Sequence, residues 1–498
     1  MTHRNRIGTA VGFALLAAIL SSCSLSDSSS NGADNGAQQP ARWSKDTRTQ
    51  LREAIANALT HGLKPELFST GELPADDGAV RKIALRYAQA LAHGYSDPVG
   101  VFKDYVDPKT TPEAYTVPRP SADLERGLDQ ALQQGNLGEW LNSLAPQTDE
   151  YRALSRAFLQ YAKQAGQVSQ QPIPVGKAIK PGASDARLPA IAAALRAGGY
   201  LPQPQQQQQQ NNAPPTSYTP DLVAAVRQFQ ADSGMKPDGV LGKDTIAVLS
   251  TGPAARARQL AVALERLRWL ERDPPKTRID VNTAAAFLDY WRDGQHVDHR
   301  NVVVGEPGWE TPQLGTPMFQ LIANPIWRVP DSIMEDEINE KSPAWLAENG
   351  FEMRDGRMVQ TPGPKNSLGL VKFDLANKDM IYLHDTPAKA LFDEPERHRS
   401  HGCIRIQNAL QFAQLLAQQD GVGDQFQKAM ASGEETMVKL KTRIPVRLLY
   451  RTAFWDGSRL QFRPDVYGWD DDVAYAIGLV RGPKPPPPQH RRGEDVGP

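Results

Sequence analysis

Apolar residues recur every three or four positions between residues 43 and 166, which is the spacing of one buried face of an amphipathic helix. The pattern is repeated several times along this segment. Examples are the series Leu51, Ile55, Leu59 and the series Leu124, Leu128, Leu132. The pattern predicts a helical N-terminal domain over 43–166. Because chemically reactive side chains are scattered here rather than clustered, we expect this domain to act as a scaffold.

A second helical unit is predicted over 186–250. Two apolar stripes, 188–195 and 222–230, flank a low-complexity insertion over 202–220 that contains a run of glutamines. A Pro-Asp-Gly turn after the second stripe leads into another short helix. We therefore expect three helices, with the insertion looping out between the first two.

The hydrophobic period changes near residue 276. Before it, leucines spaced mainly by three or four predict a connecting helix over 253–272. After it, short apolar runs bounded by Gly, Pro or Asn predict strands. A β-rich, sandwich-like domain is expected over 276–470. The tail over 482–498, which has four consecutive prolines, is expected to be disordered. The predicted fold class is multidomain α+β, and the predicted strands include 279–282, 301–305, 318–322 and 380–383.

The first residues have the pattern of an export signal. Two arginines precede an uncharged apolar run that is too short to span a bilayer but suits a secretory signal. The run ends in Leu20-Ser-Ser-Cys23, which resembles the lipobox of bacterial lipoproteins. This resemblance implies removal of residues 1–22 and acylation of Cys23. Because the residue after the cysteine is Ser24 rather than Asp, it also implies a periplasmic protein that is retained at the outer membrane. A flexible tether over 23–42 would follow. A plain secretory signal with an incidental Cys23 is the alternative.

The composition excludes several classes of protein. The chain of 498 residues is too long for one hydrophobic core, in agreement with several domains. Lys and Arg number 56 and Asp and Glu number 57, so the net charge of -1 lacks the basic surplus of a nucleic-acid-binding protein. Only 2 cysteines occur, which excludes a disulfide scaffold, and no apolar run suits a multi-pass membrane protein.

The second cysteine lies where several reactive side chains gather. An apolar strand is predicted to end at His384, and Cys403 follows Gly402, which permits close backbone approach. A cysteine attacks as the thiolate, and since its ordinary pKa is about 8.5, it needs a base at neutral pH. His384 can approach from an adjacent strand. His401 lies two residues from Cys403, on the same face of an extended segment, and His398 is also near in sequence.

Four interpretations of these residues compete. In the first, Cys403 is a nucleophile, His384 is its general base, and the N–H groups of Gly402 and Cys403 polarise a carbonyl. In the second, Cys403 and the three histidines bind zinc, although the Cys-x-x-Cys pairs usual at structural zinc sites are missing. In the third, Cys403 is a redox thiol, but it has no resolving cysteine if Cys23 is acylated. In the fourth, Cys403 is a buried structural residue, which is awkward for an unpaired thiol in an oxidising compartment.

His384 together with Ser400-His-Gly-Cys-Ile-Arg405 closely resembles the signature of the L,D-transpeptidase catalytic domain, the YkuD-like family. Segments 324–330, 363–369 and 381–387 are similar to its large periplasmic subgroup. That subgroup also has a helical scaffold and a peptidoglycan-binding module. The unit over 186–250 resembles such a three-helix module, although its glutamine-rich insertion departs from the compact family pattern. A spacer without a ligand is the alternative for this unit.

The resemblance implies a two-step reaction on cell-wall stem peptides. Cys403 attacks the third residue of a donor tetrapeptide, the terminal D-Ala leaves, and a side-chain amine of a second stem resolves the thioester to form a 3→3 cross-link. His384 is the implied general base and acid, oriented by the Asp385 backbone. Ser400 and His401 line the implied site, and Gly402 contributes to the oxyanion contacts.

The same resemblance implies substrate-binding residues, namely Arg405, Trp327 and Tyr382. For Arg405 a structural salt bridge is the alternative, and for Trp327 a position in the core. In the resembled subgroup an insertion corresponding to 334–364 acts as a lid over the site.

The sequence thus predicts an acyltransferase that cross-links peptidoglycan in cell-wall biogenesis and so affects cell shape. With water as the acceptor the same chemistry would make an L,D-carboxypeptidase. A non-catalytic, lipid-anchored peptidoglycan tether is the alternative from another class. The expected partners are stem peptides, glycan strands and the outer membrane, without nucleic acid. The predicted chemistry requires no metal and no cofactor. The acceptor preference, the protein partners and the oligomeric state stay open.

Overall fold

The computed structural model describes residues 43–103, 115–166, 173–202, 217–334 and 338–480. Contacts place all of these residues in one unit, 42–498. The predicted signal peptide with Cys23, the tether, the C-terminal tail and most of the glutamine-rich insertion lie outside the described residues. Within the described ranges, no helix combines the length and the apolar character needed to cross a membrane.

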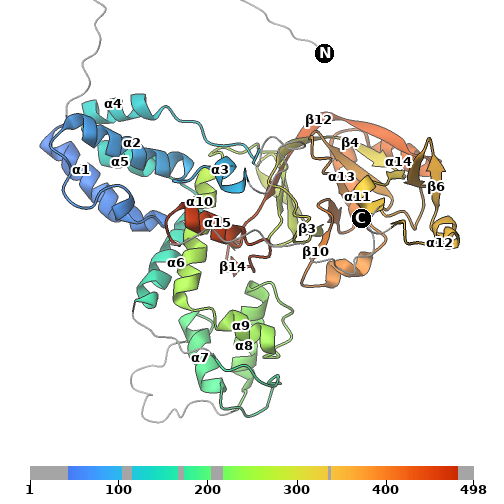
Figure 1. Ribbon diagram of the computed structural model, residues 1–498, viewed down its shortest axis with the longest axis horizontal. Coiled ribbons are helices and arrows are strands. Elements are labelled where there is room, and N and C mark those ends of the chain that lie inside the picture. The colour runs from blue at the N-terminus through green and yellow to red at the C-terminus, as the bar shows by residue number, and fades with distance from the viewer. Residues whose placement is uncertain (1–42, 104–114, 167–172, 203–216, 335–337, 481–498) are drawn as a thin grey trace, which may run out of the picture. The chain divides into compact units, whose positions relative to one another are not determined.

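The N-terminal region is helical, as predicted (Figure 1). Helix α1 begins with a capping box, in which Ser44 Oγ accepts from Thr47 N and Thr47 Oγ1 accepts from Ser44 N, both at 3.0 Å. Leu59, predicted on the buried stripe of this helix, is 44% exposed. Because α1 ends at Ala56 and a 3₁₀ helix follows, the next side chains rotate off that stripe. The helices are α1 Lys45–Ala56, η1 Asn57–His61, η2 Pro65–Leu67, α2 Asp77–His93, α3 Pro98–Phe102, α4 Leu124–Gln134, α5 Leu137–Leu144 and α6 Asp149–Ala165.

The predicted connecting helix is α10, Pro253–Trp269, and it is buried among the helices of the N-terminal region. It packs against α6 and α2. Glu265 and Arg268 form an ion pair of 2.6 Å with both side chains fully buried. Glu265 also accepts hydrogen bonds from the Ser96 N–H and hydroxyl at 2.7 and 2.8 Å. This helix is therefore fixed to the scaffold by buried charge as well as by apolar contact.

The second helical unit forms three helices around its own core, as predicted. Gln230 joins α8 to the Asp-Gly turn, since its Nε2 donates to Asp238 Oδ1 and Val240 O at 3.0 Å and its Oε1 accepts from Gly239 N at 2.8 Å. Tyr218, at the end of the predicted insertion, is buried and donates to Gly239 O at 2.7 Å. Tyr218 is therefore part of the packed unit. The helices are α7 Leu188–Ala197, α8 Pro220–Asp232 and α9 Lys243–Leu249.

The β-rich region is built on a nine-stranded sheet with the strand order β10-β3-β11-β9-β8-β4-β12-β1-β2. The sheet closes on itself because β2 pairs with β3 as well as with β1. The strands are β1 Arg278–Asn282, β2 Phe287–Arg292, β3 Gln295–Gly305, β4 Gly315–Ala323, β8 Val371–Leu375, β9 Leu383–His384, β10 His398–Ser400, β11 Ile404–Ile406 and β12 Thr436–Leu449.

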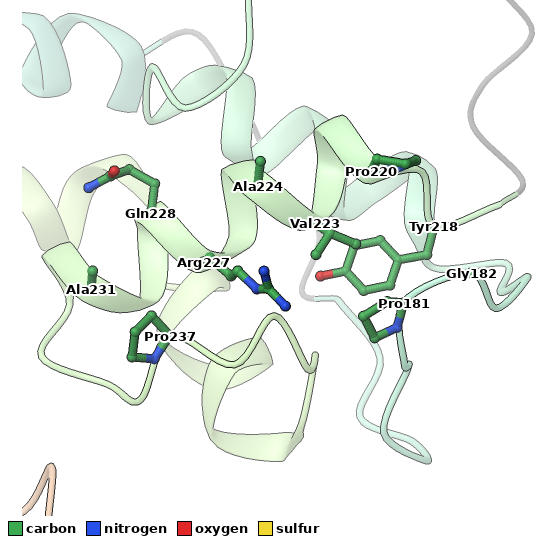
Figure 2. A pocket seen from close by; sticks show the side chains of 10 residues that line it. All are labelled: Pro181, Gly182, Tyr218, Pro220, Val223, Ala224, Arg227, Gln228, Ala231 and Pro237. Carbon is green, nitrogen blue, oxygen red and sulfur yellow. The ribbon is translucent and has the colours of Figure 1, made fainter. Parts of the chain in front are cut away.

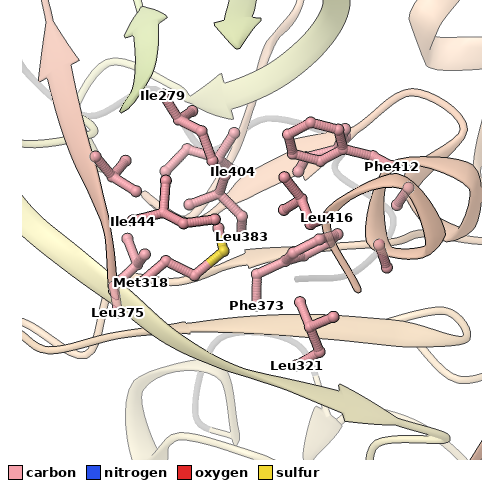
Figure 3. Packing of buried hydrophobic residues seen from close by; sticks show 14 of the residues in the cluster. Ile279, Met318, Leu321, Phe373, Leu375, Leu383, Ile404, Phe412, Leu416 and Ile444 are labelled. Carbon is pink, nitrogen blue, oxygen red and sulfur yellow. The ribbon is translucent and has the colours of Figure 1, made fainter. Parts of the chain in front are cut away.

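The core of this region lies between the strands and α13, Ala409–Gln419. Figure 3 shows Phe412 and Leu416 of this helix against Phe373, Leu383 and Ile404 of the sheet. Helix α14, Gly423–Ser432, also contributes to the core. Since side chains alternate along a strand, the neighbours of Leu383 and Ile404 in sequence lie on the opposite face of the sheet.

Two smaller elements complete the described chain. Strands β5 Trp327–Arg328, β7 Arg357–Gln360 and β6 Phe351–Arg354 form a separate sheet, with the short helices α11 Asp331–Ile333 and α12 Pro343–Glu348 beside it in sequence. The predicted lid 334–364 is thus a folded subdomain, of which residues 335–337 lie outside the described ranges. The C-terminal hairpin and helix contact α6 and α10; they are β13 Ala453–Trp455, β14 Leu460–Phe462 and α15 Trp469–Ala476.

Candidate active site

Strand register brings the predicted reactive residues to one face of the sheet. β9 lies between β8 and β11, with Lys372 opposite His384 on one side and Arg405 opposite His384 on the other. Ile404 N donates to Tyr382 O at 3.1 Å, so Cys403 lies beside Tyr382 and diagonally across from His384. This face is opposite to the one that packs on α13. The side chains that share it are those of Lys372, Tyr382, His384, Cys403 and Arg405.

His384 is fully buried, and its ring is oriented by the backbone of the next residue. Its Nδ1 donates to Asp385 O at 2.5 Å, so the proton resides on Nδ1 and Nε2 is left as the basic atom. Nε2 is buried and has no hydrogen-bond partner among the described residues. Burial, helped by the positive charge of Arg405, lowers the pKa of His384 to about 3. The imidazole is therefore neutral, with an unshared electron pair on Nε2, and burial makes it a weaker base than a free histidine.

The Asp385 carbonyl that orients His384 is itself held in place. The Asp385 carboxylate accepts from Leu370 N at 3.0 Å and forms an ion pair with Lys389. It lies directly over Gly369, where φ is +60° and a Cβ would overlap the carboxylate. Gly369 therefore allows the close approach on which the orientation of His384 depends.

Cys403 is partly exposed and carries a thiol that is harder to ionise than usual. Burial raises the pKa of Cys403 above its ordinary value. Hydrogen bonds from the Tyr382 backbone and side chain, and then the positive charges of Lys372 and Arg405, act in the opposite direction. The pair therefore rests as a neutral thiol beside a neutral imidazole, and ionisation of the sulfur requires proton transfer to His384.

The loop that carries Cys403 is fixed at both ends. Ser400 is buried, and its hydroxyl donates to Cys403 O at 2.5 Å. Gly402 has φ of +101° and its carbonyl accepts from Thr311 Oγ1 at 2.9 Å. Tyr467 approaches from the C-terminal region, with its hydroxyl donating to Gly305 O at 2.6 Å and lying 3.4 Å from Thr311 N. Sequence reasoning missed Thr311 and Tyr467, since neither belongs to the motif.

The segment that joins His401 to Cys403 is not extended. The positive φ of Gly402 turns the chain, and the His401 ring packs edge-on against Trp309 with centroids 5.1 Å apart. His398 contacts Glu396 through Nδ1 at 2.5 Å and Thr283 O through Nε2 at 2.9 Å. Within the described part of the chain, the Cys403 thiol and these histidines do not form a group with metal-binding spacing.

Lys372 is a further residue of the site that the motif did not reveal. Its Nζ lies 4.2 Å from the centre of the Tyr382 ring and 2.8 Å from Asp374 Oδ1. Gln320 Nε2 donates to the other Asp374 oxygen at 2.6 Å. The alternation of buried and partly exposed residues in Val371–Leu375 is the signal that could have placed Lys372 and Asp374 on this polar face.

The three predicted substrate-binding residues lie in different surroundings. Tyr382 is partly exposed beside Cys403, whereas Arg405 is 1% exposed behind it. Trp327 is 1% exposed and belongs to the hydrophobic cluster of the β5-β7-β6 subdomain, against which Tyr382 packs. The indole of Trp327 is thus covered in this conformation, and its contact with a donor peptide stays a prediction.

The three-helix unit has a pocket of its own, with a volume of about 690 Å³. Figure 2 shows the Arg227 side chain extending from α8 into the space between Tyr218, Pro181 and Pro237. Gln228 and Val223 of the same helix also line it. The pocket combines apolar walls with one guanidinium group.

Comparison with known families gives three matches in the same order as the predicted domains. The family described as "Scaffold domain" matches residues 37–158, and "Putative peptidoglycan binding domain" matches residues 185–249. "L,D-transpeptidase catalytic domain" matches residues 276–439, which include both His384 and Cys403.

A protein of Haemophilus influenzae named "Putative L,D-transpeptidase" is 27% identical over 243 residues, which are 44% of this chain and 49% of that protein. The chain thus spans about half the length of this curated relative. Solved L,D-transpeptidase structures from Xylanimonas cellulosilytica and Stackebrandtia nassauensis are 15% and 13% identical. Each alignment covers 55% of this chain. The alignment with the Xylanimonas structure covers 98% of that chain with a TM-score of 0.19, and the alignment with the Stackebrandtia structure covers 96% of that chain with a TM-score of 0.23. These TM-scores are too low to support an argument. From the three domain matches, the chain carries an L,D-transpeptidase catalytic domain of the YkuD type together with a scaffold domain and a peptidoglycan-binding domain.

Proposed function

We propose that this protein is a peptidoglycan L,D-transpeptidase in which Cys403 forms a thioester with a tetrapeptide stem and transfers it to a second stem. The observation that carries the proposal is the pairing of two groups across β9 and β11. A partly exposed thiol lies diagonally opposite a buried histidine whose Nδ1 is already used and whose Nε2 is available. A nucleophile and its general base must come within hydrogen-bond reach of each other. In this structure the thiol contacts Met380 O at 3.9 Å instead, so the proposed proton transfer requires the Cys403 side chain to turn toward Nε2.

In the first half-reaction, the Cys403 thiol gives its proton to His384 Nε2 while the sulfur attacks the carbonyl carbon of the third stem residue. The resulting imidazolium then gives the proton to the nitrogen of the departing D-Ala, and the C–N bond breaks to leave the thioester. The low pKa of His384 makes the imidazolium a strong acid, so proton return to a leaving amine is favourable.

In the second half-reaction, the side-chain amine of an acceptor stem attacks the thioester. The amine loses a proton through His384, the C–S bond breaks, and the sulfur leaves as the thiol. The products are one free D-Ala and one new amide bond, which would be a 3→3 cross-link. Lys372 and Arg405 lie on the same face as Cys403 and would stabilise the negative charge that develops during both steps.

We further propose that the three-helix unit holds glycan strands or stems near the catalytic domain. The pocket beside α8, with Arg227 inside it, and the matched family support this role. The lipobox-like sequence before Cys23 supports a lipid anchor at the outer membrane and a periplasmic location. The β5-β7-β6 subdomain packs on Tyr382 beside Cys403, which supports a lid role.

The test uses the chain without residues 1–23, incubated with a disaccharide tetrapeptide. The wild type is expected to release D-Ala and to form cross-linked dimers, whereas Cys403→Ala should do neither, because no other thiol occurs in that chain. A carbapenem should add covalently to the wild type only, as judged by intact-protein mass. An adduct of equal yield on Cys403→Ala would overturn the assignment of the nucleophile.

The products also separate the other activities. Tripeptide without dimers would select an L,D-carboxypeptidase, in which water resolves the thioester. If the protein binds isolated peptidoglycan but releases no D-Ala and takes up no carbapenem, the non-catalytic tether is the correct interpretation.

A further inference from the structure

A second cluster of reactive side chains lies on the β2–β3 hairpin. Leu288 and Tyr290 of β2 point into the core, so Asp289 lies on the other face of the strand. His299 of β3 is directly opposite Asp289 in the antiparallel register. A register shift between Tyr290 and Trp291 brings His296, nearer the turn, to the same carboxylate. We call Asp289, His296 and His299 the hairpin cluster.

The three side chains of the hairpin cluster converge on one point. His296 Nε2 and His299 Nδ1 each lie 2.8 Å from the same oxygen, Asp289 Oδ1. All three donor atoms lie within 4.8 Å of one another. Donor atoms around a tetrahedral zinc ion, with bonds of about 2.0–2.1 Å, are about 3.3 Å apart. Each nitrogen therefore needs to move away from the oxygen by about half an ångström, and the two nitrogens, which lie within 4.8 Å of each other, need to reach the same spacing.

The chemistry of the donors suits a zinc ion. Two imidazoles and one carboxylate are the ligand types of three-ligand zinc sites, in which a fourth position stays open. Within the described residues, Asp289 has no Lys or Arg ion pair that would already neutralise it.

The surroundings hold the rings and leave room for an ion. The His296 ring packs on Trp291 and the His299 ring on Phe287, each with centroids 5.1 Å apart. The His296 and His299 side chains are 44% and 54% exposed, so an ion can reach them. The members of the hairpin cluster also line a cavity of about 1260 Å³, into which an open coordination position would face.

We propose that the hairpin cluster binds one Zn²⁺ ion through Asp289, His296 and His299, with the fourth position open to water or a small ligand. Binding replaces the two N–H···O hydrogen bonds by three bonds to the metal, and each neutral imidazole carries its one proton on the ring nitrogen that does not bind the metal. The site lies on β2 and β3 rather than on the face with Cys403, so it goes beyond the proposed transpeptidase activity.

The experiment measures Zn²⁺ binding by isothermal titration on the chain without residues 1–23 and without a histidine tag. All proteins carry Cys403→Ala, so that the thiol cannot bind the metal and the outcome is independent of catalysis. The parent protein is expected to bind one Zn²⁺. Asp289→Asn, His296→Gln and His299→Gln should each weaken binding at least tenfold. The matched control is Asp298→Asn, which removes a carboxylate of the same hairpin that pairs with Arg300 instead.

Two further measurements make the result decisive. Co²⁺ bound by the parent protein should give the visible absorption of a tetrahedral site, and this absorption should be lost in His299→Gln but kept in Asp298→Asn. Melting temperatures without metal should be similar in all variants, which separates loss of ligands from loss of folding. Failure of the parent to bind Zn²⁺ at micromolar concentrations, or equal affinity of Asp289→Asn and Asp298→Asn, would overturn the proposal.

Discussion

At the scale of single residues, His384 and Cys403 have opposite pKa shifts with one physical origin. Burial lowers the pKa of His384 to about 3 and raises that of Cys403. Both shifts favour the uncharged form, because a low-dielectric environment penalises charge. A protonated thiol also reacts slowly with oxidants, which suits the unpaired cysteine of a chain that we propose to be exported. The nucleophile would thus form only when a substrate carbonyl is in place to receive it.

Lys372 is expected to tune the reactivity of Cys403 without touching the sulfur. Replacing it by Met removes a positive charge that lowers the pKa of Cys403, so that pKa should rise further. We expect alkylation of Cys403 by iodoacetamide near neutral pH to slow about three- to tenfold, since the thiolate fraction falls about tenfold when the pKa of a thiol rises by about one. The measurement is the pH profile of the alkylation rate.

Two comparisons control this prediction. Lys372→Arg keeps the charge and should restore most of the rate, and Lys428→Met removes an exposed lysine of α14 and should change nothing. A purely structural role for Lys372 would lower the melting temperature and leave the alkylation profile in place.

The placement of Cys403 and His384 on neighbouring segments was predictable from sequence, whereas the residues that support them were not. Cys403 and His384 stand in a short motif, and the orientation of His384 by the Asp385 backbone follows from adjacency. Thr311 and Tyr467 hold the same loop from distant parts of the chain. Their contributions depend on a fold that brings three segments together, and a hydroxyl group alone carries no signal of this in a single sequence.

At the scale of elements, the alternation of apolar and polar residues was the most informative pattern for predicting strands. The local backbone conformation that ends a strand was the hardest to predict. The strand predicted over 380–383 is only Leu383–His384, because Met380 has φ of +54° and Asn377 hydrogen-bonds both the N–H and the carbonyl of Ile381. The side-chain amide of Asn377 thus makes the hydrogen bonds to Ile381 that a neighbouring strand would otherwise make. Apolar residues alone could not indicate this, since Met and Ile are common in strands.

Helix α8 presents the residue on which peptidoglycan binding is expected to depend. Arg227→Ala should weaken binding to isolated peptidoglycan at least about tenfold, because a hydrogen bond to a charged group contributes about 1.5–3 kcal/mol. Co-sedimentation with peptidoglycan measures this. The control is Arg126→Ala on α4, where the arginine is also largely exposed and lies outside the pocket. Equal losses for both variants would indicate nonspecific charge attraction instead of a binding pocket.

At the scale of the whole molecule, a buried network joins the N-terminal helices to α10. His61 Nδ1 lies 3.0 Å from the Tyr151 hydroxyl, and Arg268 donates to that hydroxyl at 2.8 Å and to His61 O at 2.6 Å. Burial, with the charge of Arg268, lowers the pKa of His61 to about 3. The order of the scaffold, peptidoglycan-binding and catalytic domains could be predicted from sequence, but this network could not, since its members are far apart in the chain.

The low pKa of His61 predicts a loss of stability in acid. In the unfolded chain His61 takes up a proton below about pH 6.5, while the folded chain resists until about pH 3. Folding should therefore lose about 1.4 kcal/mol per pH unit in this window from this residue. Between pH 6.5 and pH 4.5, the stability of the wild type relative to His61→Gln should fall by about 2–3 kcal/mol. Urea unfolding at both pH values measures this, and an unchanged difference would contradict it.

The contact of Tyr467 with the loop that carries Cys403 has a practical consequence. The catalytic family match ends at residue 439, yet Tyr467 contacts Thr311, which holds the carbonyl before Cys403. A fragment trimmed to the family boundary would keep His384 and Cys403 but lose Tyr467, which supports the loop of Cys403. We therefore expect the smallest fragment with the proposed activity to extend beyond that boundary, so searches for inhibitors should use a protein that retains the C-terminal hairpin and helix.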